Sequence, residues 1–227
     1  MEWFNPGVPR TVSISLNEAK KVARPKVGLL VATENELRQV LRLMRPLPKR
    51  RQLFRVDHGH ETTYIGKFGS HQAVLVLCSM GTQGATGATL TANSVITTWK
   101  LAAAVFVGIA FGAHREKQSP ADVLVASQLI PYESQRRGKQ TVYRNPVPPT
   151  GGRLLNRFRN ALDWEFQRPD GSRCKMFCGP VLSGEKLVDS PKFKQELLTR
   201  IRMPLVARWR ARGCGLLRIA HKSNGFW

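Results

Sequence analysis

Long apolar runs alternate with segments of helical periodicity along most of this chain. The first run, KVGLLVAT (residues 26–33), precedes a segment in which Leu37, Val40, Leu41 and Met44 recur at helical spacing. Further apolar runs span residues 63–68, 72–79, 102–113 and 122–130. A glycine-rich segment with a helical pattern separates the run 72–79 from the run 102–113. Such runs are typical of buried strands, and this order predicts an α/β sheet with ligand-binding loops at the strand ends.

The segments between and after these runs carry weaker patterns. Residues 45–61 are basic and contain proline, which indicates a connection. Leu154, Leu155, Phe158 and Leu162 form a helical stripe that we expect to face the core. A strand in KMFCGPVLS is then followed by a helix whose start is marked by residues 189–191.

Length and composition fit one domain with a substantial core. The chain has 227 residues, and 42% of them are hydrophobic. Residues 101–113, the longest uncharged apolar stretch, are too few to span a membrane, and MEWFNPGVPR does not resemble a secretory signal. We therefore expect a cytoplasmic protein. Residues 1–25 show no clear period, so we expect a disordered leader there, a domain over residues 26–202 and a basic tail over residues 203–227.

Cysteine and histidine residues do not predict a metal site. The four cysteines are too scattered for a disulfide framework or a zinc site, and we expect buried free thiols. His58 and His60 lie near Asp57 and Glu61, but His-x-His in a polar loop is more often only loop. We expect neither a metal nor a cofactor.

The charge balance is strongly basic. Lys and Arg number 36 against 15 Asp and Glu, a formal net charge of +21, which makes phosphate-bearing partners plausible. The basic residues are spread along the sequence, over residues 49–55, 136–140, 153–159 and 208–218. No nucleic-acid-binding motif organises them, so we interpret most of them as solvated faces and do not expect nucleic acid as a partner.

Glycines separate the apolar run 72–79 from the helical pattern that follows. Gly81, Gly84 and Gly87 lead directly into that pattern. A turn of this kind can converge backbone N–H groups on an anion at a helix N-terminus, or it can simply pack a helix close to its strand. The sequence GTQGATG matches neither the dinucleotide-binding fingerprint nor the Walker loop.

Five segments of the chain resemble segments that occur in the same order in a known protein family. They are KVGLLVATENEL, CSMGTQGATGA, VFVGIAFGA, PADVLVASQLIPYE and GPVLSGEKLVD. Together they resemble the nucleoside phosphorylase superfamily, which includes the 5'-methylthioadenosine/S-adenosylhomocysteine nucleosidases, over residues 26–201. The resemblance implies a three-layer sandwich with a central mixed β-sheet flanked by helices, and it also implies assembly into dimers or larger homo-oligomers.

The resemblance further implies cleavage of the N-glycosidic bond of a purine nucleoside or nucleotide. Glu36 matches the carboxylate that holds the nucleophilic water, although the helix dipole alone would also favour a Glu in the first turn. Other positions match the loops around ribose and base, namely Ser79, Gly81, Ile109, Ala110 and Gly112. Leu187 and Val188 match the segment that contacts the purine, where family members often carry Phe at the position of Leu187.

Two departures from the family pattern shape the expected chemistry. Residues 105–107 read Val-Phe-Val where phosphorylases carry a phosphate-binding Arg, so the resemblance favours hydrolysis over phosphorolysis. The surplus of basic residues leaves room for a phosphorylated substrate.

The second departure follows Arg202. The family's G-G-E-M-E-G motif and its later acidic residue are missing, and the chain reads MPLVARWRARGCG. Codons chosen for Leu205 to Ala211 spell G-G-E-M-E-G when they are read in the neighbouring frame. We therefore predict a frameshift near Leu205, a fold incomplete at its C-terminus and little catalytic activity. The alternative is a catalytically inactive nucleotide-binding or regulatory module.

Overall fold

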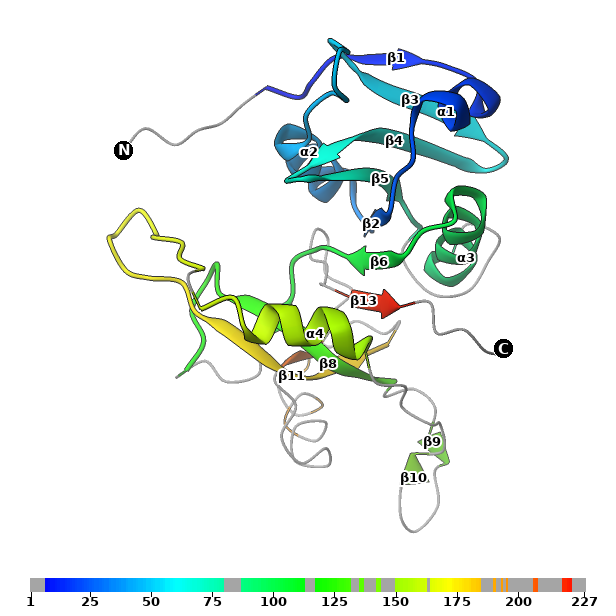
Figure 1. The fold of residues 1–227 in the computed structure, drawn as a ribbon. Coiled ribbons are helices and arrows are strands. Elements are labelled where there is room, and N and C mark those ends of the chain that lie inside the picture. Colours follow the sequence, from blue (N-terminus) through cyan, green and yellow to red (C-terminus); the bar gives the residue numbers. More distant parts are fainter. Residues whose placement is uncertain are drawn as a thin grey trace. The chain divides into compact units, whose positions relative to one another are not determined.

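The computed structural model describes residues 7–79, 87–112, 117–131, 135–136, 142–143, 150–162, 164–184, 190, 193, 195, 206–207 and 218–221. The chain divides into two compact units (Figure 1). Unit 1 comprises Met1–Gly108 and Ala220–Trp227, and unit 2 comprises Ile109–Ile219. Each unit is described by itself.

Unit 1 is built on a mixed sheet in the order β1-β3-β4-β5-β2-β6-β13 (Figure 1). The strands of this sheet are β1 (Thr11–Ser13), β2 (Val27–Val31), β3 (Leu53–His58), β4 (Glu61–Phe68), β5 (His71–Leu77), β6 (Ala103–Phe106) and β13 (Arg218–His221). Only the last two residues of β13 belong to unit 1. β2 pairs in parallel with β5 and β6, whereas β4 is antiparallel to β3 and β5. The expected α/β fold with a central mixed sheet is confirmed.

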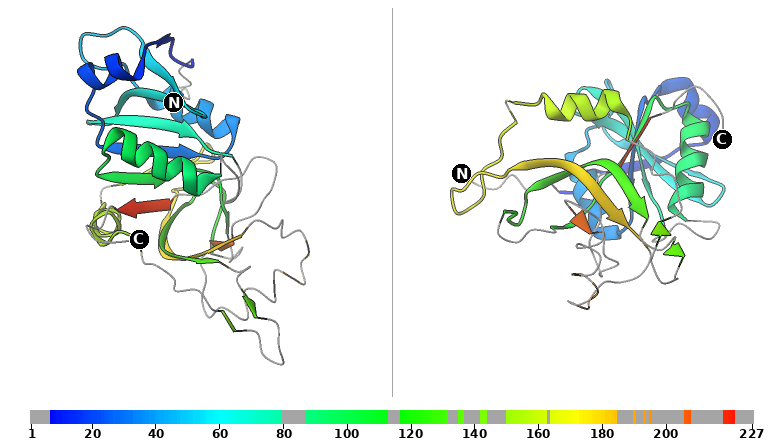
Figure 2. Two further views of the ribbon diagram at one scale, coloured as in Figure 1. Left: turned by 90° about the vertical axis from the view of Figure 1, so that its right-hand side faces the viewer. Right: turned by 90° about the horizontal axis from the view of Figure 1, so that it is seen from below.

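Helices cover both faces of this sheet (Figure 2). They are α1 (Leu16–Val22), α2 (Glu34–Leu43) and α3 (Ala88–Trp99). On one face Leu29, Val31 and Leu75 pack with Val40, Leu41 and Met44 of the α2 segment. On the other face Leu30, Val74 and Val76 pack with Ala19 of α1 and with Val95 and Trp99 of α3. Successive strand residues point to opposite faces, so both faces must be apolar, as the unbroken apolar runs indicated.

The expectation of a disordered leader is wrong for residues 11–22. β1 pairs in parallel with β3, and Ala19 of α1 is completely buried. Ser15 caps α1 in a reciprocal capping box with Glu18. A three-residue strand and a two-turn helix are too short to produce a periodic signal, which explains why the pattern indicated no structure.

Three further expectations need correction. The segment 45–61 is more than a connection, because it contains β3. The apolar run 102–113 is two strands, β6 and the short β7 (Phe111–Gly112), which belong to different units. The stripe is only partly covered: Leu154, Leu155 and Phe158 of α4 (Gly152–Arg159) are half-buried, whereas Leu162 lies beyond the helix and is 90% exposed.

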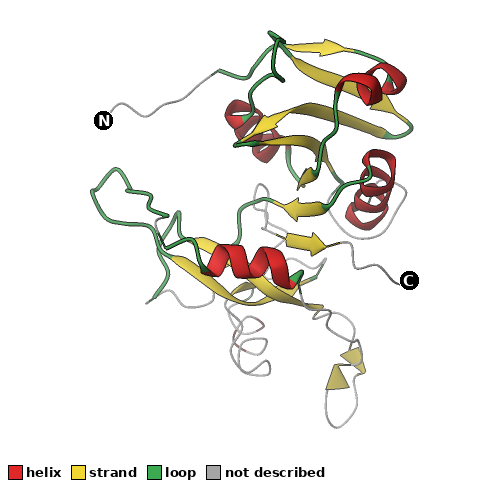
Figure 3. Cartoon of the chain, in the orientation of Figure 1, coloured by secondary structure: helices red, strands yellow, loops and turns green. Residues whose placement is uncertain are grey.

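Unit 2 contains a four-stranded sheet in the order β7-β12-β11-β8. Its long strands are β8 (Val123–Pro131) and β11 (Met176–Ser183), which pair in parallel, while β12 (Val206–Ala207) joins β11 to β7. Figure 3 shows α4 as the helix beside β8, and two short strands, β9 (Gln135–Arg136) and β10 (Val142–Tyr143), form an antiparallel pair. No described helix is long and apolar enough to cross a membrane.

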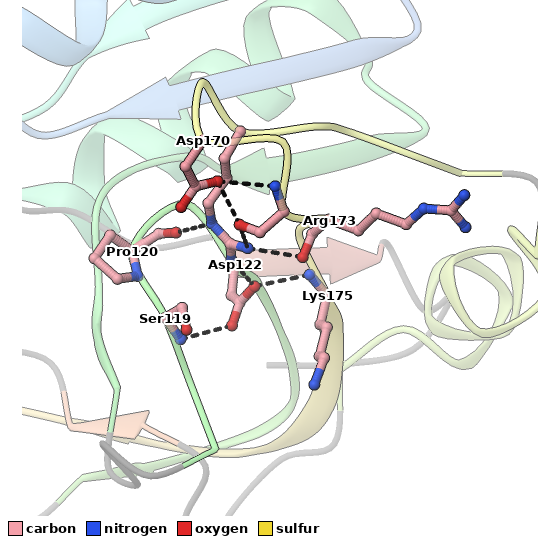
Figure 4. A network of polar contacts seen from close by, with 8 residues as sticks. Ser119, Pro120, Asp122, Asp170, Arg173 and Lys175 are labelled. Carbon is pink, nitrogen blue, oxygen red and sulfur yellow. Dashed lines mark hydrogen bonds and ion pairs between the residues drawn. The ribbon is translucent and has the colours of Figure 1, made fainter.

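A polar network ties the start of β11 to the loop before β8 (Figure 4). Asp122 accepts hydrogen bonds from the backbone N–H groups of Lys175 (2.7 Å) and Ser119 (2.8 Å), and it forms an ion pair with Arg168. Arg168 also donates to the carbonyl oxygens of Pro120 and Arg173, both at 2.7 Å. Burial acts to raise the pKa of Asp122, but these hydrogen bonds and the guanidinium together hold it below its ordinary value.

Candidate functional site

The connections that leave β2 and β5 run to opposite faces of the unit 1 sheet. α2 follows β2 and packs on one face, whereas α3 follows β5 and packs on the other. Ligands in open α/β sheets bind beyond the carboxyl ends of the strands at such a switch point. The candidate site of unit 1 therefore lies where β2 and β5 end.

Glu36 stands at this position, in the first turn of α2. It is 5% exposed, and its Oε2 accepts hydrogen bonds from the backbone N–H groups of Ala32 (3.0 Å) and Thr33 (3.1 Å). Thr33 caps the helix by accepting the N–H of Glu36 at 3.2 Å. The sequence Thr-x-x-Glu before an apolar pattern is the signature of this capping box, so Thr33 could have been predicted from sequence.

The same contacts clarify the two interpretations of Glu36. The capping box joins the carboxyl end of β2 to the start of α2 and accounts for a side chain with an oxygen at this position. A Gln at the third helical position also completes a capping box, so these hydrogen bonds do not require a negative charge. The charge itself is the feature that a catalytic function would use.

Ser79 lies at the neighbouring strand end, two residues after β5. The backbone N–H of Cys78 donates to the carbonyl of Val31 at 2.8 Å, which holds the two strand ends together, and the Ser79 side chain is exposed. Glu36 and Ser79 thus belong to one unit and to one edge of its sheet. Gly81 lies outside the described residues.

The remaining predicted residues belong elsewhere. Ile109, Ala110 and Gly112 are in unit 2, where Ile109 is 48% exposed and Ala110 packs against Ala126 and Val181. Gly112 pairs with Val206 through its backbone. These contacts place Ala110 and Gly112 in or beside the unit 2 sheet, and their function in substrate binding stays a prediction. Leu187 and Val188 lie outside the described residues.

The N-terminus of α3 directly follows the glycine-rich segment. Gly87 is its N-cap, no side chain makes a capping hydrogen bond there, and the first turn has no acidic residue. The positive end of the helix dipole is thus not balanced by a carboxylate of its own helix.

The cysteine and metal expectations can be compared with the described residues. Cys78 and Cys174 are buried free thiols, as expected, whereas Cys178 is only partly buried. Burial raises the pKa of the Cys178 thiol, with the Arg159 guanidinium acting in the opposite direction. Among the residues that the structure describes, no group of three or more His, Cys, Asp or Glu side chains could hold a metal ion.

A mixed sheet with helices on both faces and a carboxylate at the switch point defines an α/β domain of a class that binds ligands at this edge of the sheet. Residues 26–207 match the sequence model of the phosphorylase superfamily. The chain belongs to this superfamily, and the resemblance inferred from the five sequence segments is confirmed.

Relatives and solved structures are consistent with this assignment. The chain is 26% identical over 192 residues to a death domain-containing ATP nucleosidase of Amphimedon queenslandica, and the match covers 76% of this chain and 36% of the relative. The chain thus spans about a third of the length of that protein.

The solved structures establish similarity of fold. The native futalosine hydrolase of Helicobacter pylori has a TM-score of 0.64 at 18% identity, with 86% of this chain and 83% of that chain covered. The 5'-methylthioadenosine/S-adenosylhomocysteine nucleosidase of Neisseria meningitidis, in complex with methylthio-immucillin-A, has a TM-score of 0.61 at 17% identity, with 82% and 76% covered.

Proposed function

We propose that this domain hydrolyses the N-glycosidic bond of a purine nucleoside or nucleotide. The observation that carries the proposal is the buried carboxylate of Glu36 at the carboxyl end of β2, at the switch point of a phosphorylase-superfamily sheet. The nucleosidase and hydrolase activities of the similar proteins support it.

In the proposed reaction, water replaces the base at the anomeric carbon of the sugar. The C–N bond breaks, its electron pair leaves with the base, and the water oxygen forms the new bond to carbon. Glu36 orients this water and accepts its proton, while the base takes up a proton as it leaves. The carboxylate also stabilises the positive charge that develops on the sugar. Ser79, at the end of the neighbouring strand β5, contacts the substrate in this proposal.

Hydrolysis is preferred to phosphorolysis because of the residues around the end of β6. The segment 105–107 carries no cationic side chain; Phe106 is buried, and the N–H of Val107 donates to the carbonyl of Leu30 at 2.8 Å. A phosphate co-substrate would need a cation at this position of the family. Water needs none.

A phosphorylated substrate is compatible with the same site. The uncapped N-terminus of α3 follows β5 and can attract a phosphate, and the net charge of +21 favours anionic ligands in general. The similarity to an ATP nucleosidase supports a nucleotide.

The second candidate is a binding module that retains the fold without chemistry. It is favoured by the capping box, because the two backbone bonds to Glu36 explain this residue without catalysis. In this case nucleotides would stabilise the chain without being converted.

One experiment distinguishes the two candidates. Adenosine, 5'-methylthioadenosine and ATP are each incubated with the chain, free base is quantified by chromatography, and thermal unfolding is recorded with the same ligands. Release of adenine supports hydrolysis. Stabilisation without adenine supports the binding module, and the absence of both effects contradicts both candidates.

Assembly and location belong to the same proposal. We place the chain in a cytoplasmic homo-oligomer. Light scattering of the purified chain, together with fractionation of cells that express it, measures both properties, and a monomer or a membrane-pelleted protein contradicts this part of the proposal.

A further inference from the structure

The charged side chains of unit 1 are sorted between the two edges of its sheet. The carboxylates lie in the first turns of α1 and α2, at the end of β3 and at the start of β4. The described ones are Glu18, Glu34, Glu36, Asp57 and Glu61. All these element ends lie at the edge where the parallel strands β2 and β5 finish. This is also the edge of the candidate site.

Cations gather at the opposite edge, where these parallel strands begin. Backbone hydrogen bonds join neighbouring elements there: the N–H of Leu53 donates to Arg10, that of Arg45 to Lys67, and that of Ala102 to Lys26, at 3.0, 2.9 and 2.9 Å. We call this region the basic edge. It consists of Arg10, Arg24, Lys26, Arg45, Lys67 and Lys100, with the loop residues Lys49, Arg50 and Arg51.

Gly66 permits one of these approaches. A Cβ atom at this position would lie 2.6 Å from the carbonyl oxygen of Arg45 and 2.5 Å from the Leu53 side chain. Since no real side chain tolerates such contacts, the glycine is what allows Arg45 to bridge to Lys67 beside β4.

The cations of the basic edge are exposed and have no carboxylate partner among the described residues. All are exposed except Lys67, which is half-buried. Two other exposed cations of unit 1 are paired with carboxylates: Arg38 with Glu34 at 3.4 Å and Arg55 with Asp57 at 3.2 Å. An unpaired set of like charges is repulsive, and an anionic ligand would relieve this repulsion.

Two of these cations occupy backbone conformations that favour glycine. Lys49 has φ 63° and Lys100 has φ 49°, both in the left-handed region. A residue with a side chain costs about 1 kcal/mol there relative to glycine. Both positions therefore carry a charged side chain although glycine would be conformationally more favourable.

Helix dipoles explain only part of this arrangement. Arg45 and Lys100 follow the C-termini of α2 and α3, where positive charge is stabilising. Arg10, Lys26 and Lys67 lie at strand ends, where no helix terminus accounts for them.

In contrast to the expectation from the sequence, we propose that the basic edge binds the phosphate backbone of nucleic acid without regard to base sequence. Phosphate contacts need exposed Lys and Arg, and the edge supplies them over the width of six adjacent strands, from β1 to β6. Base stacking and membrane anchoring both use exposed aromatic side chains, and no aromatic residue in the described part of unit 1 is exposed. The charge therefore favours a nucleic acid backbone over unpaired bases or a lipid surface.

This inference is independent of the proposed hydrolysis. The basic edge and the candidate site lie at opposite ends of the same strands, so a nucleic acid on one edge leaves the other edge accessible. A chain without nucleosidase activity would still bind nucleic acid.

The test is fluorescence anisotropy with duplex DNA and single-stranded RNA of matched length, over a series of salt concentrations. We compare the wild type with the variant K26Q/K49Q/R51Q and with R153Q/R157Q/K175Q, a control that removes the same charge from exposed residues of unit 2. For duplex DNA, each lost phosphate contact reduces the slope of log affinity against log salt by about 0.9. The basic-edge variant should therefore lose about 2–3 from this slope and at least about tenfold in affinity. The control should stay within about twofold of the wild type.

Three results overturn the proposal. The first is equal loss in both variants, which would mean diffuse charge attraction. The second is no salt-sensitive binding by the wild type. The third is stronger binding to phosphatidylserine vesicles than to either oligonucleotide. Whether DNA or RNA binds more tightly identifies the natural source of the phosphates, and circular dichroism of each variant ensures that a loss of affinity is not a loss of folding.

Discussion

The two edges of the unit 1 sheet are made by the same strands and have opposite characters. The edge where the parallel strands end carries the carboxylates, including Glu36, and the first turns of α2 and α3. The edge where they begin carries the ends of these helices and the unpaired cations. Since helices that alternate with parallel strands all run in the same direction, their dipoles favour acids at one edge and bases at the other. The common direction of the helices therefore explains which edge carries acids and which carries bases. Only the cations that no helix terminus accounts for need a functional explanation.

The largest effect should come from neutralising Glu36. We expect E36Q to lower the rate of base release about 100- to 10,000-fold, because the water loses its general base. Its unfolding midpoint should stay close to that of the wild type, because Gln preserves the capping box.

E34Q is the matched control, since Glu34 is an exposed residue of the same helix turn. The basic-edge variant K26Q/K49Q/R51Q should also retain the wild-type rate. If E36Q hydrolyses nucleosides as fast as the wild type, the functional contrast between the edges disappears and Glu36 is only a cap.

A buried ion pair in unit 2 provides the contrast to the unpaired cations of the basic edge, because its cation stabilises the fold. The side chains of Arg168 and Asp122 are only 13% and 4% exposed. D122N should reduce the free energy of unfolding by about 3 kcal/mol, because it leaves a buried guanidinium without its partner. Urea denaturation measures this, and neutralisation at the basic edge should have a far smaller effect. Equal effects would show that the basic edge is structural.

The pH dependence of the same variant follows from the lowered pKa of Asp122. A carboxylate whose pKa is lower in the folded than in the unfolded state stabilises the protein above its unfolded pKa, about 3.9. This stabilisation is lost as the pH falls through the folded pKa. The difference between wild type and D122N should therefore be full near neutral pH and shrink below about pH 4. A difference that grows with acidity would contradict the assignment.

Removing the Glu36 side chain altogether should have a smaller effect on stability than D122N. E36A leaves the backbone N–H groups of Ala32 and Thr33 without their acceptor and should cost about 2 kcal/mol. Comparison with E36Q separates the hydrogen bonds from the charge. If E36Q is as unstable as E36A, the charge itself holds the end of β2.

The smallest effect sharpens the comparison at the basic edge. Lys100 ends α3 in a left-handed conformation, so K100G should stabilise the protein, by up to about 1 kcal/mol. The same substitution should weaken nucleic acid binding by a few fold, because one cation is lost. Thermal unfolding and anisotropy together test this, and a variant that is less stable or that binds as well as the wild type would contradict the prediction.

Strong local patterns predicted most of the fold, and weak ones did not. The strands β2, β4, β5, β8 and β11 and the helices α2 and α3 follow from apolar runs and helical spacing, since burial on one or both faces imposes these patterns. β1 and α1 were missed because they are too short to repeat a pattern. β3 was missed because the basic loop before it hides its apolar residues.

The functions of the candidate site residues stay predictions, and the structure adds where the described ones lie. Glu36 could be found from its strand, cap and helix in one continuous segment. For Ala110 and Gly112, packing and pairing within the second sheet account for the residues without a ligand. Local sequence contains no signal that distinguishes these two reasons for a small residue.

The sequence by itself determined the α/β class, the capping box at Glu36 and the net positive charge, because each depends on neighbouring residues or on composition alone. Only the tertiary structure decided where the charge lies. Arg10, Lys26, Arg45 and Lys67 are far apart in the chain, and the parallel and antiparallel pairing of the strands brings them to one edge. The register of hydrogen bonds between distant strands brings cations together that are separated in the sequence. No local sequence pattern contains this register.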